Sequence, residues 1–207
     1  MITSGITAGT PAKIPFGAGV YFQGIEYNEK KAPAEAVVKA AVIGATQEGG
    51  SVAITPEIFE IPLDGADVSM MEQQVKVGET ATMETSFAEL TPDLVAKTVI
   101  GETGEDAAGG YDIITSSSDI EVGHYYKGFG FWGHHLDGRP LIILFKNALC
   151  TSGFAMEPKA KTNTVFKGTF KCVSDADYGT TKLPYAIFIK KAEDWEKVDP
   201  DEVAVTG

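Results

Sequence analysis

The chain has 207 residues and a formal net charge of −12, from 17 basic and 29 acidic residues. A hydrophobic content of 43% and a mean hydropathy near zero are typical of a soluble globular protein with one main domain, and they exclude a disordered chain. The longest apolar stretch, residues 141–145, is far shorter than the roughly 20 residues of a membrane-spanning helix, so we expect no membrane association. The excess of acid disfavours a nucleic-acid-binding surface. No signal peptide is visible, and we expect synthesis in the cytoplasm.

Residues 1–34 are rich in Gly, Pro, Thr and Ala, which predicts an extended N-terminal arm. A disordered terminus would carry fewer aromatic residues than this segment does. We therefore expect the arm to dock on its own subunit or on a neighbour through its aromatic side chains, Phe16, Tyr21, Phe22 and Tyr27.

Residues 35–190 are predicted to form one mainly β domain, a β-sandwich or barrel-like fold. Residues 51–61, 80–88 and 165–173 alternate between apolar and polar side chains, which indicates half-buried strands. The segment 34–43 favours a strand leading into a hairpin at Gly49-Gly50, although its composition also suits a helix. Residues 51–88 contain a second turn signal, Asp64-Gly65.

The Asp137-Gly138 dipeptide lies between two apolar runs and predicts a tight hairpin. The run that follows it, residues 141–145, has no alternation, so we expect a strand covered on both faces. It would lie either at the centre of a sandwich or against another subunit. The candidate inter-subunit residues of this strand are Leu141, Ile143 and Phe145.

One flanking helix is predicted at about 91–100, because Thr91 can cap it, Pro92 suits its first position and Gly101 can end it. Residues 101–120 are rich in Gly, Ser and acid and predict a long acidic loop. Residues 191–207 form an acidic C-terminal tail, in which a short helix around Trp195 would be broken at Pro200.

The sequence contains no catalytic motif, so we expect no enzymatic activity and no cofactor. His134, His135 and Asp137 precede a tight turn and alternate along a strand, which favours structural residues over a metal site. Both cysteines, Cys150 and Cys172, are expected to stay reduced, with Cys172 buried. The aromatic residues between Tyr125 and Trp132 alternate with glycines and favour a core strand over a sugar-stacking platform.

The charges are clustered along the chain. Residues 56–75 contain five acidic residues and residues 101–121 contain six. Neither segment contains a Lys or Arg. Residues 157–171 carry four lysines against one glutamate. Opposite patches of this kind suit a self-associating subunit, although solvated surfaces are the simpler interpretation.

Turns, strands and one helix follow one another in a distinctive order over residues 14–190. The segments that carry the pattern are 42–50, 51–61, Asp64-Gly65, 80–90, 91–94, 137–140, 141–148, 151–154 and 165–171. In this order of elements the chain resembles the major tail proteins, or tail tube proteins, of long-tailed bacteriophages. It departs from them in residues 101–120 and beyond Lys191.

The resemblance implies a structural virion protein made in the cytoplasm of a bacterial host. Six subunits would close into a ring, their sheets would join into an inner β-barrel, and the rings would stack into a hollow tail tube. The implied partners are further copies of the chain, a tape measure protein, and tail terminator and baseplate proteins. DNA would pass through the lumen during ejection without specific binding.

An acidic lumen would keep DNA from adhering, because bound phosphates require neutralisation by Lys or Arg. The candidate lumen-lining acids are Glu84, Glu102, Glu105, Asp106, Asp112 and Asp119. The aromatic arm would bridge to the next ring. Two other functions are open at this point: the tube of a contractile tail or related injection device, and a carbohydrate-binding β-sandwich module.

Overall fold

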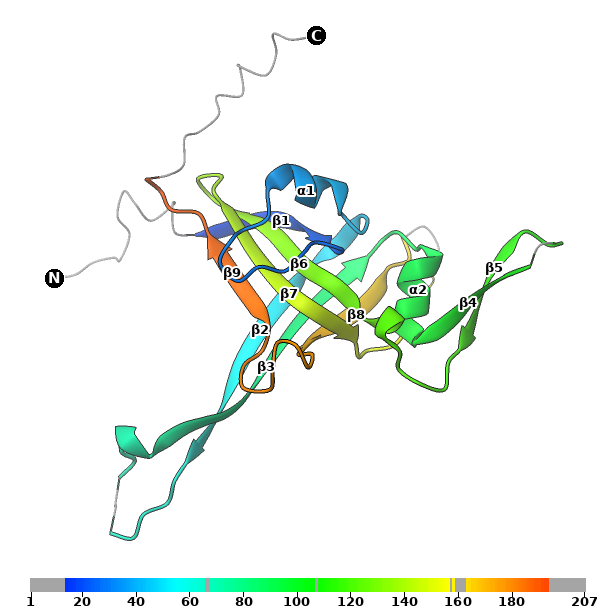
Figure 1. The fold of residues 1–207 in the computed structure, drawn as a ribbon. Helices are drawn as coiled ribbons and strands as arrows, with labels where there is room; N and C mark the ends of the chain where they lie inside the picture. The colour runs from blue at the N-terminus through cyan, green and yellow to red at the C-terminus, as the bar shows by residue number, and fades with distance from the viewer. Residues whose placement is uncertain (1–13, 66–67, 107, 157, 159–162, 194–207) are drawn as a thin grey trace.

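The structure, a computed structural model, describes residues 14–193 except 66–67, 107, 157 and 159–162. The predictions for the first 13 residues and for most of the C-terminal tail, including the helix around Trp195, lie outside the described residues. The protein is mainly β, with antiparallel strand pairing throughout its sheets (Figure 1). The helices are α1 (Glu35–Ala40) and α2 (Pro92–Val99), and short 3-10 turns lie at Met71–Gln73 and Val122–His124.

Over the described residues, the main sheet has seven strands in the order β1-β6-β7-β8-β3-β2, and β9 pairs with the part of β7 that precedes its pairing with β8. A separate two-stranded ribbon consists of β4 and β5. The strand bounds are β1 Pro15–Phe22, β2 Thr46–Glu60, β3 Gln74–Phe87, β4 Gly101–Asp106, β5 Tyr111–Ser116, β6 Tyr126–His135, β7 Pro140–Cys150, β8 Phe166–Val173 and β9 Tyr185–Ile189.

The predicted period of two is confirmed in β3 and β8, which pair with each other. On β8, Phe166, Phe170 and Cys172 are buried while Lys167 and Lys171 are exposed. The rings of Phe129 and Phe170 lie 4.4 Å apart at the centre of this core. One face of β3 and β8 therefore closes the main core and the other stays in solvent.

Strand β7 is covered on both faces, as its apolar run predicts. Phe145 belongs to the main core with β3 and β8, whereas Ile142 and Leu144 belong to a second core beneath α1. That second core also holds Val38 of α1 and Trp132 of β6. Two layers of apolar contacts on one strand explain why residues 141–145 show no alternation.

The predicted hairpin and the predicted flanking helix are both present. Gly138 has a φ of +90° in the turn between β6 and β7, the conformation that glycine adopts without strain. Helix α2 begins as expected, because the Thr91 hydroxyl accepts a hydrogen bond from the Leu94 N–H at 3.3 Å. Within the described part of the chain, no helix is long and apolar enough to cross a membrane.

The strand favoured for residues 34–43 is wrong: residues 35–40 form α1. Helical spacing turns Val38 inward and leaves Val37 exposed, and an i,i+4 ion pair joins Lys39 to Glu35 at 2.9 Å. The hairpin expected at Gly49-Gly50 is also absent, since both glycines lie inside β2. A Cβ on Gly50 would clash with the Tyr21 hydroxyl, so glycine is required there by packing.

Two further expectations need correction. Part of the N-terminal arm is a core strand, because β1 pairs with β6 and buries Tyr21 and Phe22. The acidic loop of residues 101–120 is instead mostly the β4–β5 ribbon, in which Gly101 pairs with Ser116 and Asp106 pairs with Tyr111. Its turn is closed by a hydrogen bond from the Gly110 N–H to the Asp106 carbonyl at 2.8 Å.

Candidate assembly surfaces

The most exposed apolar surface lies on the far half of the β2–β3 hairpin. Strand β3 pairs with β8 only over Thr82–Phe87, so residues 57–65 and 68–78, here called the distal hairpin, extend away from the sheet (Figure 1). Met71 is 84% exposed and Val68 is 75% exposed. The other exposed large apolar residues of the distal hairpin are Ile58, Phe59, Ile61, Leu63, Met70, Val75 and Val77.

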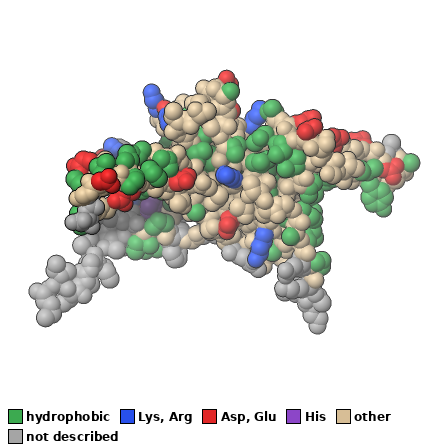
Figure 2. Space-filling model, turned by 90° about the horizontal axis from the view of Figure 1, so that it is seen from below, with side chains coloured by type: hydrophobic (Ala, Val, Ile, Leu, Met, Phe, Trp, Pro, Cys, Tyr) green, Lys and Arg blue, Asp and Glu red, His purple; other side chains and the backbone are tan. Residues whose placement is uncertain are grey.

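The distal hairpin is nevertheless well formed. Phe59 pairs with Val75 in the ladder, and the Ile61 N–H donates to the Gln73 carbonyl at 2.9 Å. The buried Gln73 side chain accepts from the Met70 N–H at 2.9 Å, which fixes the turn at its end. Apolar and acidic side chains gather at this end of the molecule when it is viewed from below (Figure 2, left). An ordered segment that leaves so much apolar surface in water is typical of an interaction site.

The second surface is the β4–β5 ribbon, which projects from the opposite side of the main sheet from β9 (Figure 1). Directly paired residues share a face, so Glu102, Gly104 and Asp106 lie together with Thr115, Ile113 and Tyr111. We call this the ribbon face. It is exposed along its length, with Tyr111 71% exposed, and only Asp106 half-buried in the turn. The other face is covered at its base, where Gly101 is buried beside Val99 of α2.

The third surface is the outer side of β9. Ile187 is 48% exposed and Ile189 is 60% exposed, and their cross-strand partners on β7 are Ile143 and Leu141. Among the described strands, none pairs with β9 on its other edge. We call Leu141, Ile187, Ile189, Lys190 and Lys191 the β9 face.

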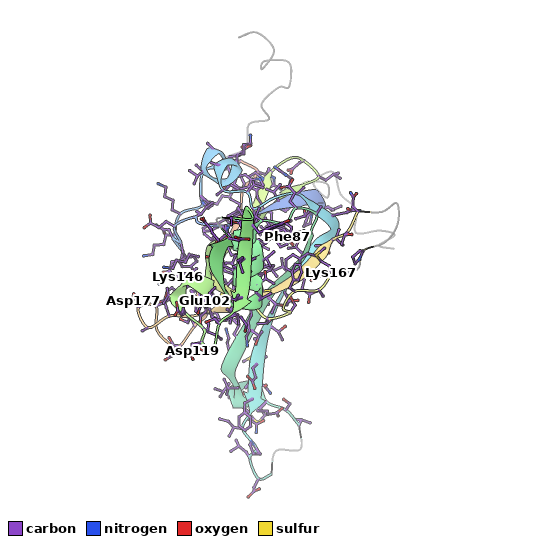
Figure 3. The ribbon with its side chains drawn as sticks, turned by 90° about the vertical axis from the view of Figure 1, so that its right-hand side faces the viewer. Phe87, Glu102, Asp119, Lys146, Lys167 and Asp177 are labelled. Carbon is purple, nitrogen blue, oxygen red and sulfur yellow. The ribbon has the colours of Figure 1, made fainter. Side chains whose placement is uncertain are left out.

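The structure divides the six candidate lumen acids between two places. Glu84 lies on the wet face of β3, where its carboxylate accepts a hydrogen bond from the Ser51 hydroxyl at 3.2 Å. Glu102, Glu105, Asp106 and Asp112 lie on the ribbon, and Asp119 lies in the segment that follows it. In Figure 3, Lys167, which shares the wet face with Glu84, lies well apart from Glu102 and Asp119. Glu84 and the ribbon acids therefore do not form one patch within a subunit.

The aromatic residues predicted to bridge rings are largely committed to their own subunit. Tyr21 donates its hydroxyl hydrogen bond to the Glu84 carbonyl at 3.0 Å, and Phe22 is fully buried. Tyr27 is half-buried against Tyr178, with ring centroids 6.0 Å apart. Phe16 belongs to β1 opposite His134. Tyr21 and Phe22 are thus unavailable to a neighbour, because the strand that carries them completes the core.

The residues predicted for an inter-subunit strand have mixed environments. Phe145 is fully buried and Ile143 is 9% exposed, and β7 has strands on both of its edges, so it cannot add a neighbour's strand. Leu141 is half-buried at the margin of the β9 face. Of the three predicted residues, Leu141 is therefore the one whose side chain can contact a neighbouring subunit, beside β9.

Three aromatic residues of the run between Tyr125 and Trp132 are buried, so they are not available to stack on a sugar. Tyr126 and Phe129 are fully buried and Trp132 is 7% exposed. The Tyr126 hydroxyl donates to the Leu94 carbonyl at 3.0 Å inside the core, and burial raises the pKa of this phenol. Core packing, the alternative favoured by the sequence, accounts for these side chains.

The histidines considered for a metal site, His134 and His135, lie at the C-terminal end of β6. The Trp132 indole N–H donates to the His134 Nε2 at 3.2 Å, while His135 is buried. Asp137 is occupied by Arg139, whose Nε lies 2.6 Å from it. Over the described residues, no group of three His, Cys, Asp or Glu side chains is arranged to hold a metal ion.

Sequence reasoning missed the distal hairpin and the β9 face as surfaces. Their sequence signal is a pair of apolar residues two positions apart on a strand, such as Val75 and Val77 or Ile187 and Ile189, and these side chains are exposed in the structure. No family model and no curated protein sequence matches the chain.

Proposed function

We propose that this chain is a non-enzymatic structural subunit that assembles with copies of itself into stacked rings, forming a hollow tube of the phage tail-tube kind. In this proposal the subunit has the barrel-like tail-tube fold and rings of six copies. The tube would belong to a virion tail and conduct DNA without binding it specifically. Tape measure, terminator and baseplate proteins would be its other partners.

The distal hairpin is the observation that carries the proposal. Its paired part, from Glu57 and Gly78 to Glu60 and Gln74, extends about 13 Å at roughly 3.3 Å per residue. A two-stranded hairpin is marginally stable alone in water, and this one exposes apolar side chains on both faces. Covering it with another copy would remove that surface from water. A hairpin directed away from the sheet is suited to contact the next ring along a tube axis.

The wet face of β3 and β8 supports a channel-lining role for the main sheet. Its exposed or half-buried side chains are short and hydroxylated at Thr82 and Thr169. Its charges are mixed, because Glu84 lies diagonally between Lys167 and Lys171 in the ladder. A face of this kind presents hydroxyl groups to passing DNA but has no continuous row of cations that would hold its phosphates. We therefore propose that Glu84, rather than the ribbon acids, lines the lumen.

The tube proposal is tested by removing the apolar character of the distal hairpin. We expect the variant Val68→Asp/Met71→Asp to form rings but not tubes in negative-stain electron microscopy, because carboxylates at the two most exposed apolar positions would remain charged in the contact. The matched control is Val37→Asp, which alters an exposed valine on α1. It should form tubes like the wild type.

Two results would contradict the proposal. Wild-type protein that stays a 22.0 kDa monomer across a concentration series, with or without preformed tube ends as seeds, would argue against a tube subunit. Tubes of normal length from the hairpin variant would show that the distal hairpin is not an assembly surface.

A further inference from the structure

The ribbon is poorly stabilised by its own subunit. Glu105 lies directly opposite Asp112, and like charges in that position destabilise a strand pair. Apart from the covered base beside α2, the ribbon lies in solvent, and two-stranded ribbons are marginal there. Among the described residues, none of its four carboxylates has a salt bridge to a Lys or Arg. Glu105 and Asp112 lie on the other face of the ribbon, so a basic, partly apolar partner on the ribbon face would cover Tyr111 and Ile113 and pair with Glu102 and Asp106.

The β9 face has the complementary properties. Hydrogen bonds from the Lys146 N–H to the Pro184 carbonyl and from the Lys190 N–H to the Pro140 carbonyl set the pairing of β9 with β7. In an antiparallel ladder the alternate residues, Ile187 and Ile189, then direct their backbone N–H and C=O groups to the open edge. Natural proteins usually protect such an edge. Here it carries exposed isoleucines and is followed at once by Lys190 and Lys191, with Glu193 3.7 Å from the Lys191 ammonium.

We propose that the ribbon of one copy docks on the β9 face of the next copy, and that this is the lateral contact that closes the ring. Tyr111 and Ile113 of the ribbon face lie against Ile187 and Ile189. The carboxylates of the ribbon face, Glu102 and Asp106, lie near Lys190 and Lys191. This inference rests on the proposed self-assembly and supplies its missing lateral interface.

The placement of the two surfaces fits this contact. The ribbon and β9 lie on opposite sides of the subunit, and the distal hairpin points in a third direction (Figure 1). A contact between two different patches of one chain is heterologous, so each copy uses one patch on each side and the series closes into a ring if the rotation allows. The distal hairpin stays available for axial contact. Aromatic and apolar anchors surrounded by charged residues are the usual composition of such an interface.

The experiment uses two variants with one damaged surface each, made in the Val68→Asp/Met71→Asp background so that only lateral assembly is followed. The ribbon variant is Tyr111→Asp/Ile113→Asp, and the β9 variant is Ile187→Asp/Ile189→Asp. A matched control, Val37→Asp/Val122→Asp, changes two exposed apolar residues elsewhere, which are 52% and 70% exposed. Circular dichroism and urea unfolding verify that every variant is folded.

Light scattering and sedimentation velocity then measure the mass. We expect the ribbon variant and the β9 variant each to need about a tenfold or greater increase in concentration for ring formation, because each loses a buried anchor pair. The control should assemble like its parent. An equimolar mixture of the two variants retains one intact contact, so it should form a species of twice the 22.0 kDa subunit mass and nothing larger.

The outcomes separate this contact from the wider proposal. Rings from both surface variants at the parental concentration, or a mixture that remains monomeric, would overturn the ribbon–β9 contact while leaving self-assembly intact. Failure of the unmodified protein to assemble at any concentration would overturn the proposed function and this contact together.

Discussion

Asp175 connects the end of β7 to the loop before β9. Its carboxylate accepts hydrogen bonds from the Lys146 ammonium at 2.9 Å, the Asn147 amide at 2.8 Å and the Tyr178 N–H at 3.0 Å. These bonds, led by that from Lys146, lower the pKa of Asp175 to about 2. Because all three donors favour the charged form, protonation weakens the loop attachment.

The sign of the resulting pH dependence is fixed by that lowered pKa. An unfolded aspartate has a pKa of about 3.9, so the stabilisation is complete above that value and is lost as the pH falls toward about 2. We expect Asp175→Asn to flatten this part of the dependence of the unfolding free energy on pH, measured by urea unfolding between pH 5 and pH 2. Asp177→Asn, in the same loop, is the control and should keep the wild-type slope.

The start of α2 is an element whose stability can be tested through one side chain. Replacing Thr91 by Ala removes the hydroxyl that accepts from the Leu94 N–H, and we expect a loss of about 1 kcal/mol in the free energy of unfolding. Thr91→Ser retains the hydroxyl and should stay within a few tenths of a kcal/mol of the wild type. An equal loss in both variants would contradict a capping role.

Elements with local signals were predictable from the sequence. Helix α2 has its cap and first-turn proline, and β8 alternates over eight residues, so neither depends on distant contacts to be recognised. Helix α1 was missed because its six residues give little periodicity, and Val38 enters the core only through contacts with the distant β6 and β7 strands. The ribbon was missed because opposed acids and glycines hide the weak alternation of Tyr111 and Ile113.

The candidate surfaces were less predictable than the strands. Alternation identifies the wet face that carries Glu84, but the exposure of Ile187 and Ile189 depends on which strand pairs with β9. That pairing joins residues 40 to 48 positions apart in the sequence. The burial of Tyr21 and Phe22 likewise follows from the pairing of β1 with β6. Surface assignment therefore needed the three-dimensional arrangement.

For the whole molecule, the proposed channel predicts an effect of one charge on DNA passage. In tubes of the Glu84→Lys variant, the new lysine would lie opposite Thr169 and between Lys167 and Lys171 on the wet face of β3 and β8. This part of the face would then carry three lysines and no acidic residue. We expect these tubes to retain duplex DNA at low salt and release it at high salt, whereas wild-type tubes retain little. Filter retention of labelled DNA across a salt series measures this. Glu105→Lys, on the ribbon, should behave like the wild type, and equal retention by both variants would argue against Glu84 as a lumen residue.

The whole chain has a chemical property that follows from its two cysteines. Both are buried and unpaired, and burial raises the pKa of the Cys172 thiol to about 12. The reactive thiolate of Cys172 is therefore scarce at neutral pH, and burial keeps both sulfurs from crosslinking between copies. In the proposed tail tube, subunits would pass from a reducing cell into an oxidising medium without forming disulfide bonds through these two cysteines. Disulfide bonds would then contribute nothing to the durability of the tube.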